Sequence, residues 1–158
     1  MDKNPRILVI DDDKVIRHTL AMTLEDEGYI VDTAENGEEA IQKTEANFYN
    51  LAIVDWRLPD FEGTKLLHEL KETTPKMAKI MLTGYPSMNN AIDAVNKRAD
   101  AFLTKPVAID ELLVKMKELL ELQEEENHYS QAKVAEYIQA RTRQALSAEP
   151  GKKLDGSR

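Results

Sequence analysis

Residues 7–29 read ILVIDDDKVIRHTLAMTLEDEGY, and they combine a short apolar run, an acidic turn and an amphipathic stretch. The run Ile7–Ile10 is continuous and rich in β-branched residues, which is typical of a strand buried on both faces. Apolar residues then recur at helical spacing, and Asp13 stands where an N-cap would be needed. The stretch predicts a strand, a turn and a helix in direct succession.

This unit recurs along the chain. Four further apolar runs have the same character: Tyr29–Thr33, Leu51–Val54, Lys79–Leu82 and Ala101–Leu103. The stretches after them show helical spacing and begin near Asn36-Gly37, Gly63, Ser87 or Asn89, and Asp110. Strands that alternate with helices predict an α/β fold with a parallel sheet covered on both faces. Ligands of such a sheet bind at the carboxyl ends of its strands, near the point where strand order reverses.

Composition excludes several classes of function. The 158 residues carry a net charge of −8, which disfavours general attraction to nucleic acid or to an anionic membrane. There is no cysteine, so disulfides, thiolate chemistry and cysteine metal sites are excluded. The start lacks the apolar core of a signal peptide, and no apolar run approaches the ~20 residues that span a bilayer. We therefore expect a soluble, cytoplasmic protein with no membrane association.

The C-terminal part differs in charge from the rest. Residues 1–126 have a net charge of −11 and residues 127–158 a net charge of +3. We expect one domain over 1–122, a helical extension or linker over 123–147, and a disordered tail over 148–158, with the helix stopped at Glu149-Pro150-Gly151. The extension could be a free tail, a dimerising helix, or a linker to an output domain. Its apolar stripe is ragged, so a strong coiled coil is not expected.

Polar residues that can do chemistry follow the predicted strands: Asp11, Asp12, Asp55, Thr83 and Lys105. In a parallel sheet they meet at one edge, where crowded carboxylates stay ionised only beside a cation. Oxygen ligands of this kind suit Mg²⁺. Lysine and threonine suit the oxygens of a transferring phosphoryl group, and an aspartate can be a nucleophile toward phosphorus. These are the parts of an aspartyl-phosphate site.

Four motifs carry a family resemblance: VIDDD at 9–13, VDWRLPDFEG at 54–63, LTGYPS at 82–87 and FLTKP at 102–106. Over about residues 5–122 the chain resembles the response-regulator receiver domain of two-component signalling, of the CheY-like kind. The resemblance implies a flavodoxin-like, doubly wound (βα)5 fold with a five-stranded parallel sheet in the order 2-1-3-4-5. The extended C-terminal helix would follow it.

The resemblance also implies a role for each site residue. Mg²⁺ would be held by Asp11, Asp12, Asp55 and the backbone carbonyl of Arg57. Asp55 would be the phosphoacceptor, Thr83 and Lys105 would bind the phosphoryl oxygens, and the Lys105–Pro106 bond would be cis. Thr83 and Phe102 would form the switch, and Lys97-Arg98 would belong to the output surface.

The implied function is a phosphorelay receiver, not an enzyme, that assists only its own phosphorylation and dephosphorylation. The donor would be a sensor histidine kinase or a phosphotransfer protein. The output would be a downstream effector protein or a missing output domain, with homodimerisation on phosphorylation as a further possibility.

Three alternatives are weaker. A phosphohydrolase of the haloacid-dehalogenase type needs a second aspartate two residues after the nucleophile, where Arg57 stands. A degenerate receiver that only binds partners would not need the complete acidic and basic set. Residues 127–158 are too short and too polar for a helix-turn-helix, so direct DNA binding is not expected. Among the remaining residues, we expect Asp13 to cap a helix, Asp60 and Glu62 to stay solvated, and Trp56 to be partly exposed.

Overall fold

The computed structural model describes residues 4–84 and 99–156, with side chains omitted for Thr64 and 147–156. Five parallel strands form one sheet in the order β2-β1-β3-β4-β5. They are β1 (Arg6–Ile10), β2 (Ile30–Ala34), β3 (Leu51–Asp55), β4 (Ala78–Thr83) and β5 (Ala101–Thr104). The predicted fold class and strand order are confirmed, with strand ends that differ from the sequence prediction by one residue at most.

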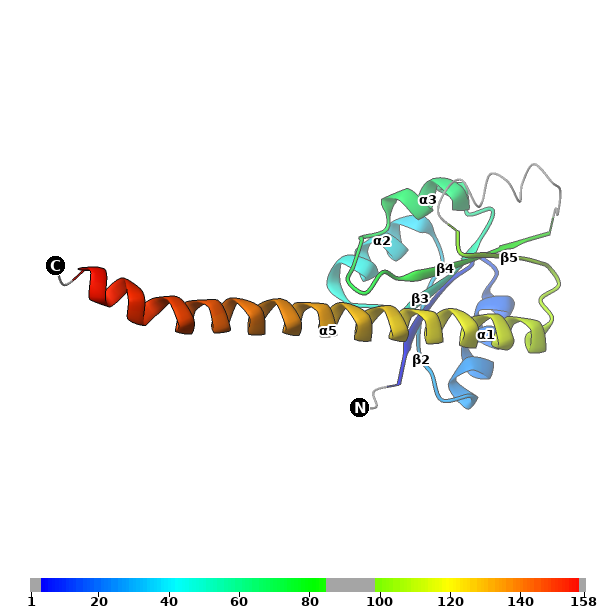
Figure 1. The fold of residues 1–158 in the computed structure, drawn as a ribbon. Helices are drawn as coiled ribbons and strands as arrows, with labels where there is room; N and C mark the ends of the chain where they lie inside the picture. Colours follow the sequence, from blue (N-terminus) through cyan, green and yellow to red (C-terminus); the bar gives the residue numbers. More distant parts are fainter. Residues whose placement is uncertain (1–3, 85–98, 157–158) are drawn as a thin grey trace. The chain divides into compact units, whose positions relative to one another are not determined.

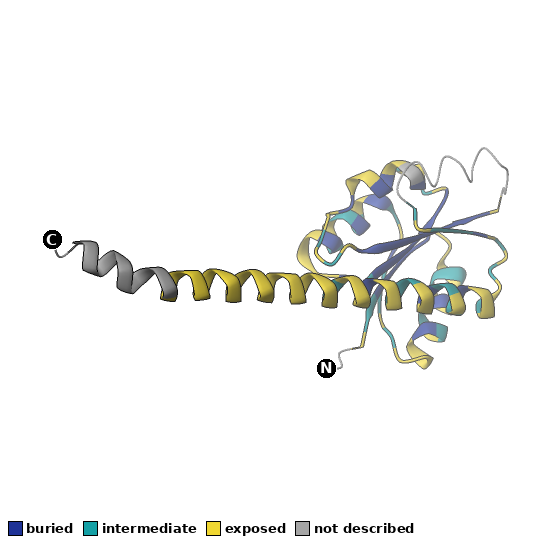
Figure 2. Cartoon of the chain, viewed as in Figure 1, coloured by how far each residue is buried: buried dark blue, intermediate teal, exposed yellow. Residues whose placement is uncertain are grey.

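Helices cover both faces of this sheet (Figure 1). They are α1 (Lys14–Asp26), α2 (Gly37–Ala46), α3 (Gly63–Glu69) and α5 (Ile109–Gly156). Alternate residues of a strand point to opposite faces, so each central strand contributes to two cores. Ile7, Val9, Ile53 and Leu82 pack in the core with α1 and α5, whereas Leu8, Ile10, Val54 and Met81 pack in the core with α2 and α3. Figure 2 shows how completely the central strands are buried.

Side-chain caps fix where the first two helices begin. Asp13 is the N-cap of α1, and its carboxylate accepts hydrogen bonds from the N–H groups of Val15 and Ile16. Asn36 is the N-cap of α2 and accepts from Glu39 N. The expected capping role of Asp13 is therefore confirmed. The helix expected around Ala91, Ile92 and Val95 lies outside the described residues.

The chain divides into two compact units, Met1–Gln123 and Glu124–Arg158. Helix α5 extends to Gly156, so the expected stop at Glu149-Pro150-Gly151 is wrong in this structure. A proline costs the helix one hydrogen bond, but Lys152, Lys153 and Leu154 beyond it are good helix formers. Residues 124–146 are exposed apart from half-buried Asn127 (Figure 2). Within the described part of the chain, no helix is both long and apolar enough to cross a membrane.

A buried polar side chain anchors the domain part of α5. Gln123 donates hydrogen bonds to the backbone carbonyls of Asn50 at 2.8 Å and Lys76 at 2.7 Å. Its own carbonyl oxygen accepts from the Asn50 side chain at 3.0 Å. Asn50 in turn accepts from Arg6 N at 2.9 Å. Gln123 thus ties α5 to the loops that precede β3 and β4.

We predict that Gln123→Ala lowers the free energy of unfolding by about 2 kcal/mol, because it removes the three hydrogen bonds of a buried side chain. Urea denaturation of the whole chain measures the loss. The matched control is Gln131→Ala on the exposed part of α5, which should change the stability little. Equal stability of both variants would contradict an anchoring role for Gln123.

Candidate functional site

Three carboxylates meet where β1 and β3 end. Asp11 and Asp12 follow β1, and Asp55 is the last residue of β3. These two strands are neighbours in the sheet, and the chain order reverses between them. One oxygen from each carboxylate lies within 4.8 Å of the others. Asp11 and Asp55 are only 2% and 7% exposed, whereas Asp12 is exposed. This Asp cluster is an oxygen-only arrangement that could hold a metal ion.

Lys105 brings a positive charge into the cluster from the end of β5. Its ammonium group lies 3.1 Å from Asp11 Oδ2 and 3.1 Å from Asp55 Oδ1. The backbone N–H of Lys105 also donates to the carbonyl of Thr83 at 2.6 Å, which holds the ends of β4 and β5 together. The Lys105–Pro106 bond is cis, as the resemblance implied. The structure therefore brings together Asp11, Asp12, Asp55 and Lys105.

The pKa shifts reflect this crowding. Burial and the nearby charge of Asp11 raise the pKa of Asp55, and the Lys105 ammonium and the Arg57 N–H offset only part of the rise. For Lys105, burial alone would lower the pKa, but Asp11 and Asp55 outweigh it and raise the pKa above the ordinary value. Lys105 is therefore charged at neutral pH, and ionised Asp55 is under electrostatic strain.

Thr83, Phe102 and Trp56 lie near the end of β3, the strand that ends in Asp55. Thr83 ends β4 and is fully buried, while Phe102 on β5 is half-buried. The ring of Phe102 meets Trp56 edge to face, with centroids 6.5 Å apart. The expected partial exposure of Trp56 is wrong, since it is 8% exposed and belongs to the core beside α2 and α3. Side chains alternate between the two faces of a sheet, so Trp56 points to the same face as Val54, two residues before it.

The loop between Asp55 and α3 is tightly folded. Gly63 N donates to the Trp56 carbonyl at 2.7 Å, and a Cβ at Gly63 would clash with the Asp55 carbonyl oxygen. Glycine at this position is therefore required by close packing. Arg57 faces Glu62 in an isolated antiparallel bridge, which holds the backbone of Arg57 two residues after Asp55.

Asp60, at the tip of this loop, corrects a sequence expectation. It is exposed, as expected, but it is not simply solvated. Its carboxylate accepts hydrogen bonds from Gly37 N at 2.8 Å and Glu38 N at 3.0 Å, at the start of α2. Slight burial would raise its pKa, but these N–H groups outweigh it and lower the pKa. Sequence reasoning missed this contact because it joins residues more than twenty positions apart.

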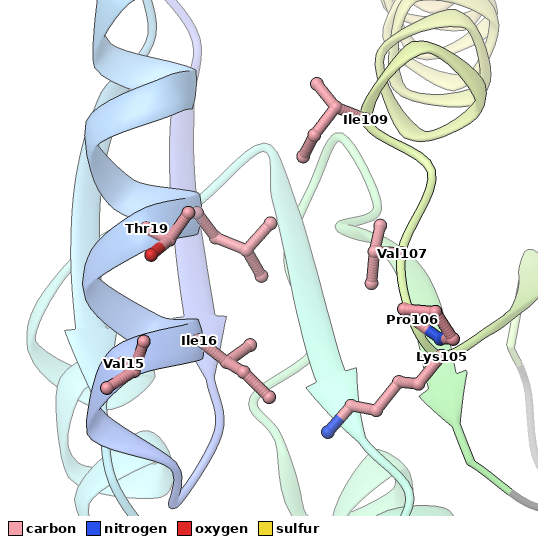
Figure 3. A pocket seen from close by; sticks show the side chains of 8 residues that line it. Val15, Ile16, Thr19, Lys105, Pro106, Val107 and Ile109 are labelled. Carbon is pink, nitrogen blue, oxygen red and sulfur yellow. The ribbon is translucent and has the colours of Figure 1, made fainter.

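An apolar hollow of about 270 Å³ lies beside Lys105. It is lined by α1 and by the segment that joins β5 to α5 (Figure 3): Val15, Ile16, Thr19, Leu20, Lys105, Pro106, Val107 and Ile109. Figure 3 shows the Lys105 side chain extending from this segment alongside the sheet. Val15 is 73% exposed although it is apolar. The sequence placed Val15 and Ile16 on a helix face, but gave no sign that the segment after β5 lies across from them.

Comparison with known proteins agrees with this geometry. Residues 7–117 match the family described as the response regulator receiver domain. The chain belongs to this family. A CheY-like receiver domain protein from Methanospirillum hungatei JF-1 is 45% identical over 78% of this chain and 99% of its own, with a TM-score of 0.74. The receiver is thus a signalling domain of two-component systems, and the family assignment made from the motifs is confirmed.

Two curated relatives match the receiver over 115 residues, which is 73% of this chain. The response regulator MprA of Mycobacterium sp. (strain KMS) is 33% identical, and the virulence transcriptional regulatory protein PhoP of Salmonella typhimurium (strain 14028s) is 31% identical. The match covers 50% and 51% of those proteins. The chain therefore spans about half the length of the curated relatives it matches.

The electrostatic strain on Asp55 generates a stability prediction in metal-free buffer. Its folded-state pKa is raised, so ionising Asp55 costs stability. The cost grows as pH rises from the unfolded-state pKa to the raised pKa and is complete above it. Asp55→Asn should therefore raise the melting temperature at pH 7, because it removes this cost. The gain should vanish in acid, below the unfolded-state pKa of about 3.9. Thermal unfolding in EDTA across this pH range measures it, and a loss of stability at pH 7 would contradict it.

Proposed function

We propose that the receiver accepts a phosphoryl group on Asp55 and thereby switches a protein-interaction surface. The observation that carries the proposal is the position of Lys105, whose ammonium group contacts both Asp11 and Asp55 at 3.1 Å. A nucleophilic carboxylate, a neighbouring acidic pair and a fixed cation at one sheet edge are what phosphoryl transfer to aspartate requires.

The proposed transfer is a single displacement at phosphorus. An Asp55 oxygen attacks the phosphorus of a phosphohistidine, a P–O bond forms and the P–N bond breaks. The bonding electrons leave with the imidazole of the donor, and Asp55 becomes an acyl phosphate. We expect Lys105, which contacts Asp55, to pair with a phosphoryl oxygen, and Thr83, the last residue of β4, to hydrogen-bond another. The receiver thus contributes position and charge to its own modification, and it assists the later hydrolysis in the same way.

The acidic residues fit a magnesium ion. Asp11, Asp12 and Asp55 offer only oxygen atoms, close enough to share one ion, and Arg57 follows the acceptor by two residues. We propose that these carboxylates and the Arg57 backbone carbonyl hold Mg²⁺. When bound, Mg²⁺ would neutralise charge on the phosphoryl oxygens.

The switch is proposed to run through Thr83 and Phe102. A phosphate on Asp55 adds negative charge and acceptor oxygens beside the end of β4, which favours a shift of the Thr83 hydroxyl toward it. Phe102 contacts the ring of Trp56, the residue after the acceptor, so a change at Asp55 can reach β5 through this aromatic pair. The proposed output residues Lys97 and Arg98 lie outside the described residues. An effector protein, an output domain or a second copy would bind the altered surface.

The apolar hollow is proposed as the contact site of the phosphodonor protein. In-line transfer requires the phosphohistidine to approach over the edge that carries Asp55 and Lys105. The hollow lies next to Lys105, and exposed Val15 at its rim offers apolar area to a partner. A sensor histidine kinase or a phosphotransfer protein is the occupant to which the proposal commits.

A phosphohydrolase is the weaker candidate. It would need a general acid two residues after Asp55, but Arg57 stands there and cannot release a proton at neutral pH. The part of α5 after residue 123 is a single exposed helix, which supplies no packed helix-turn-helix, so DNA binding is not part of the proposal.

Incubation with Mg²⁺ and acetyl phosphate tests the acceptor. The wild type should gain the mass of one phosphoryl group in intact-mass spectrometry, and Asp55→Asn should gain none. Lys105→Ala should be labelled about a hundredfold more slowly, because it loses the cation that stabilises the transferring group. Labelling of the Asp55→Asn chain would refute Asp55 as the acceptor.

Transfer from a panel of purified, autophosphorylated histidine kinases tests the docking surface. Val15→Glu at the hollow should slow transfer from the active kinase about tenfold, since the variant places a charge in an apolar contact. Met22→Glu is the matched control, because Met22 is a 65% exposed apolar residue of the same helix that does not line the hollow. Both variants should react normally with acetyl phosphate. Equal slowing by the two changes would argue against the hollow.

A further inference from the structure

The structure points to a positioning residue for the metal and acceptor site. We infer that Asp60 fixes the loop after Asp55 to the start of α2, and so holds the Arg57 carbonyl where a divalent cation binds. The inference rests on the proposed function of that site. Asp60 itself lies at the loop tip and touches neither the acceptor nor the acidic pair in any contact that the structure records.

The loop is closed by its own hydrogen bonds, but these do not attach its tip to the rest of the domain. Its base is closed by the contact between Gly63 N and the Trp56 carbonyl, and its tip by a 3.0 Å hydrogen bond from Leu58 N to the Phe61 carbonyl. Pro59 and Asp60 lie between these last two residues. Neither belongs to a strand or a helix, so the sheet alone does not fix where the tip points.

The start of α2 anchors the tip. A helix leaves its first N–H groups without partners in the helix. Here the Asn36 side chain accepts a hydrogen bond from Glu39 N. The two carboxylate oxygens of Asp60 accept from Gly37 N and Glu38 N. The negative carboxylate also lies at the positive end of the helix dipole, which favours this contact. The first three donors of α2 are therefore satisfied, two of them by a residue of the acceptor loop.

Packing reinforces the hydrogen bonds. The ring of Phe61 lies so close to Gly37 that a Cβ there would clash with it. Phe61 is half-buried and packs against the core between the sheet and α2 and α3. Asp60 and Phe61 thus hold the tip of the loop from adjacent positions, and the Phe61 contact needs glycine at position 37.

The segment from the end of β2 to the start of α2 also contacts the acidic pair Asp11 and Asp12, through Asp11. Asp11 N donates to the carbonyl of Ala34, the last residue of β2, at 3.1 Å. Residues 34–38 therefore contact the loop after β1 and the loop after β3, which carry the proposed metal ligands. A fixed distance between these two loops is what a small cation with strict geometry requires.

Titration calorimetry with Mg²⁺ tests the inference, with fluorescence of Trp56, the only tryptophan of the chain, as a second readout. Asp60→Ala should weaken Mg²⁺ binding about tenfold, as loss of an orienting partner does in other metal sites. Asp60→Asn keeps one acceptor oxygen and should recover part of the affinity. Glu38→Gln removes an equal charge at the same helix start but keeps the backbone donor, so its affinity should match the wild type.

A cap that only stabilises the fold predicts a different result. In that case Asp60→Ala would lower the midpoint of urea unfolding in EDTA and leave the Mg²⁺ dissociation constant unchanged, which would overturn the inference. Gly37→Ala gives an independent check, because alanine favours the helix but displaces Phe61. It should weaken Mg²⁺ binding while Asp60 is intact, and unchanged binding would count against the inference.

The two proposals fail in different ways. If the wild type binds Mg²⁺ and is phosphorylated, but Asp60→Ala binds Mg²⁺ equally well, only the positioning role is wrong. If the wild type binds no Mg²⁺, the proposed metal site is wrong and the inference is overturned with it.

Discussion

The ammonium group of Lys105 lies between two carboxylates that the sheet brings together. Asp11 follows β1 and Asp55 ends β3, and neighbouring strands are about 4.8 Å apart, so the sheet brings the two carboxylates close together. Lys105 comes from β5 and spans the edge to reach both. With Asp12 the cluster holds three carboxylates and one ammonium group, so negative charge remains in excess. This imbalance suits the divalent cation and the phosphoryl group that we propose for the site.

The fold was predictable because its signals are local. Continuous β-branched runs, helical spacing and Asp13 or Asn36 before a helix are properties of short segments, and the structure confirms them. The convergence of Asp11, Asp12, Asp55 and Lys105 was also predictable, since parallel strands must place their carboxyl ends at one edge. The strand order needed the family resemblance, because periodicity alone does not say which strands are neighbours.

Features that depend on tertiary contacts were not predictable. Asp60 looks like an ordinary turn residue, and only the path of the chain brings it to α2. Trp56 was expected to be partly exposed because it follows a polar acceptor, but it faces the core and packs against Phe102. The hollow beside Lys105 likewise needs α1 and the segment after β5 to be adjacent. In each case the sequence points to one side of the contact, and only the folded chain shows which residues form the other side.

The role inferred for the start of α2 explains how elements without a ligand can still set the geometry of the site. Strand β2 and helix α2 contribute none of the proposed ligands, yet their junction contacts the loops after both β1 and β3. The loops after β1 and β3 keep some freedom relative to one another. The hydrogen-bond ladder between β1 and β3 stops before the proposed ligands begin. A third element that holds both loops removes that freedom without occupying the site. In the inferred arrangement, the acidic edge stays open to a cation and a phosphodonor. Its geometry is held by the backbone donors of Gly37 and Glu38 and by Phe61, which a side chain at Gly37 would displace.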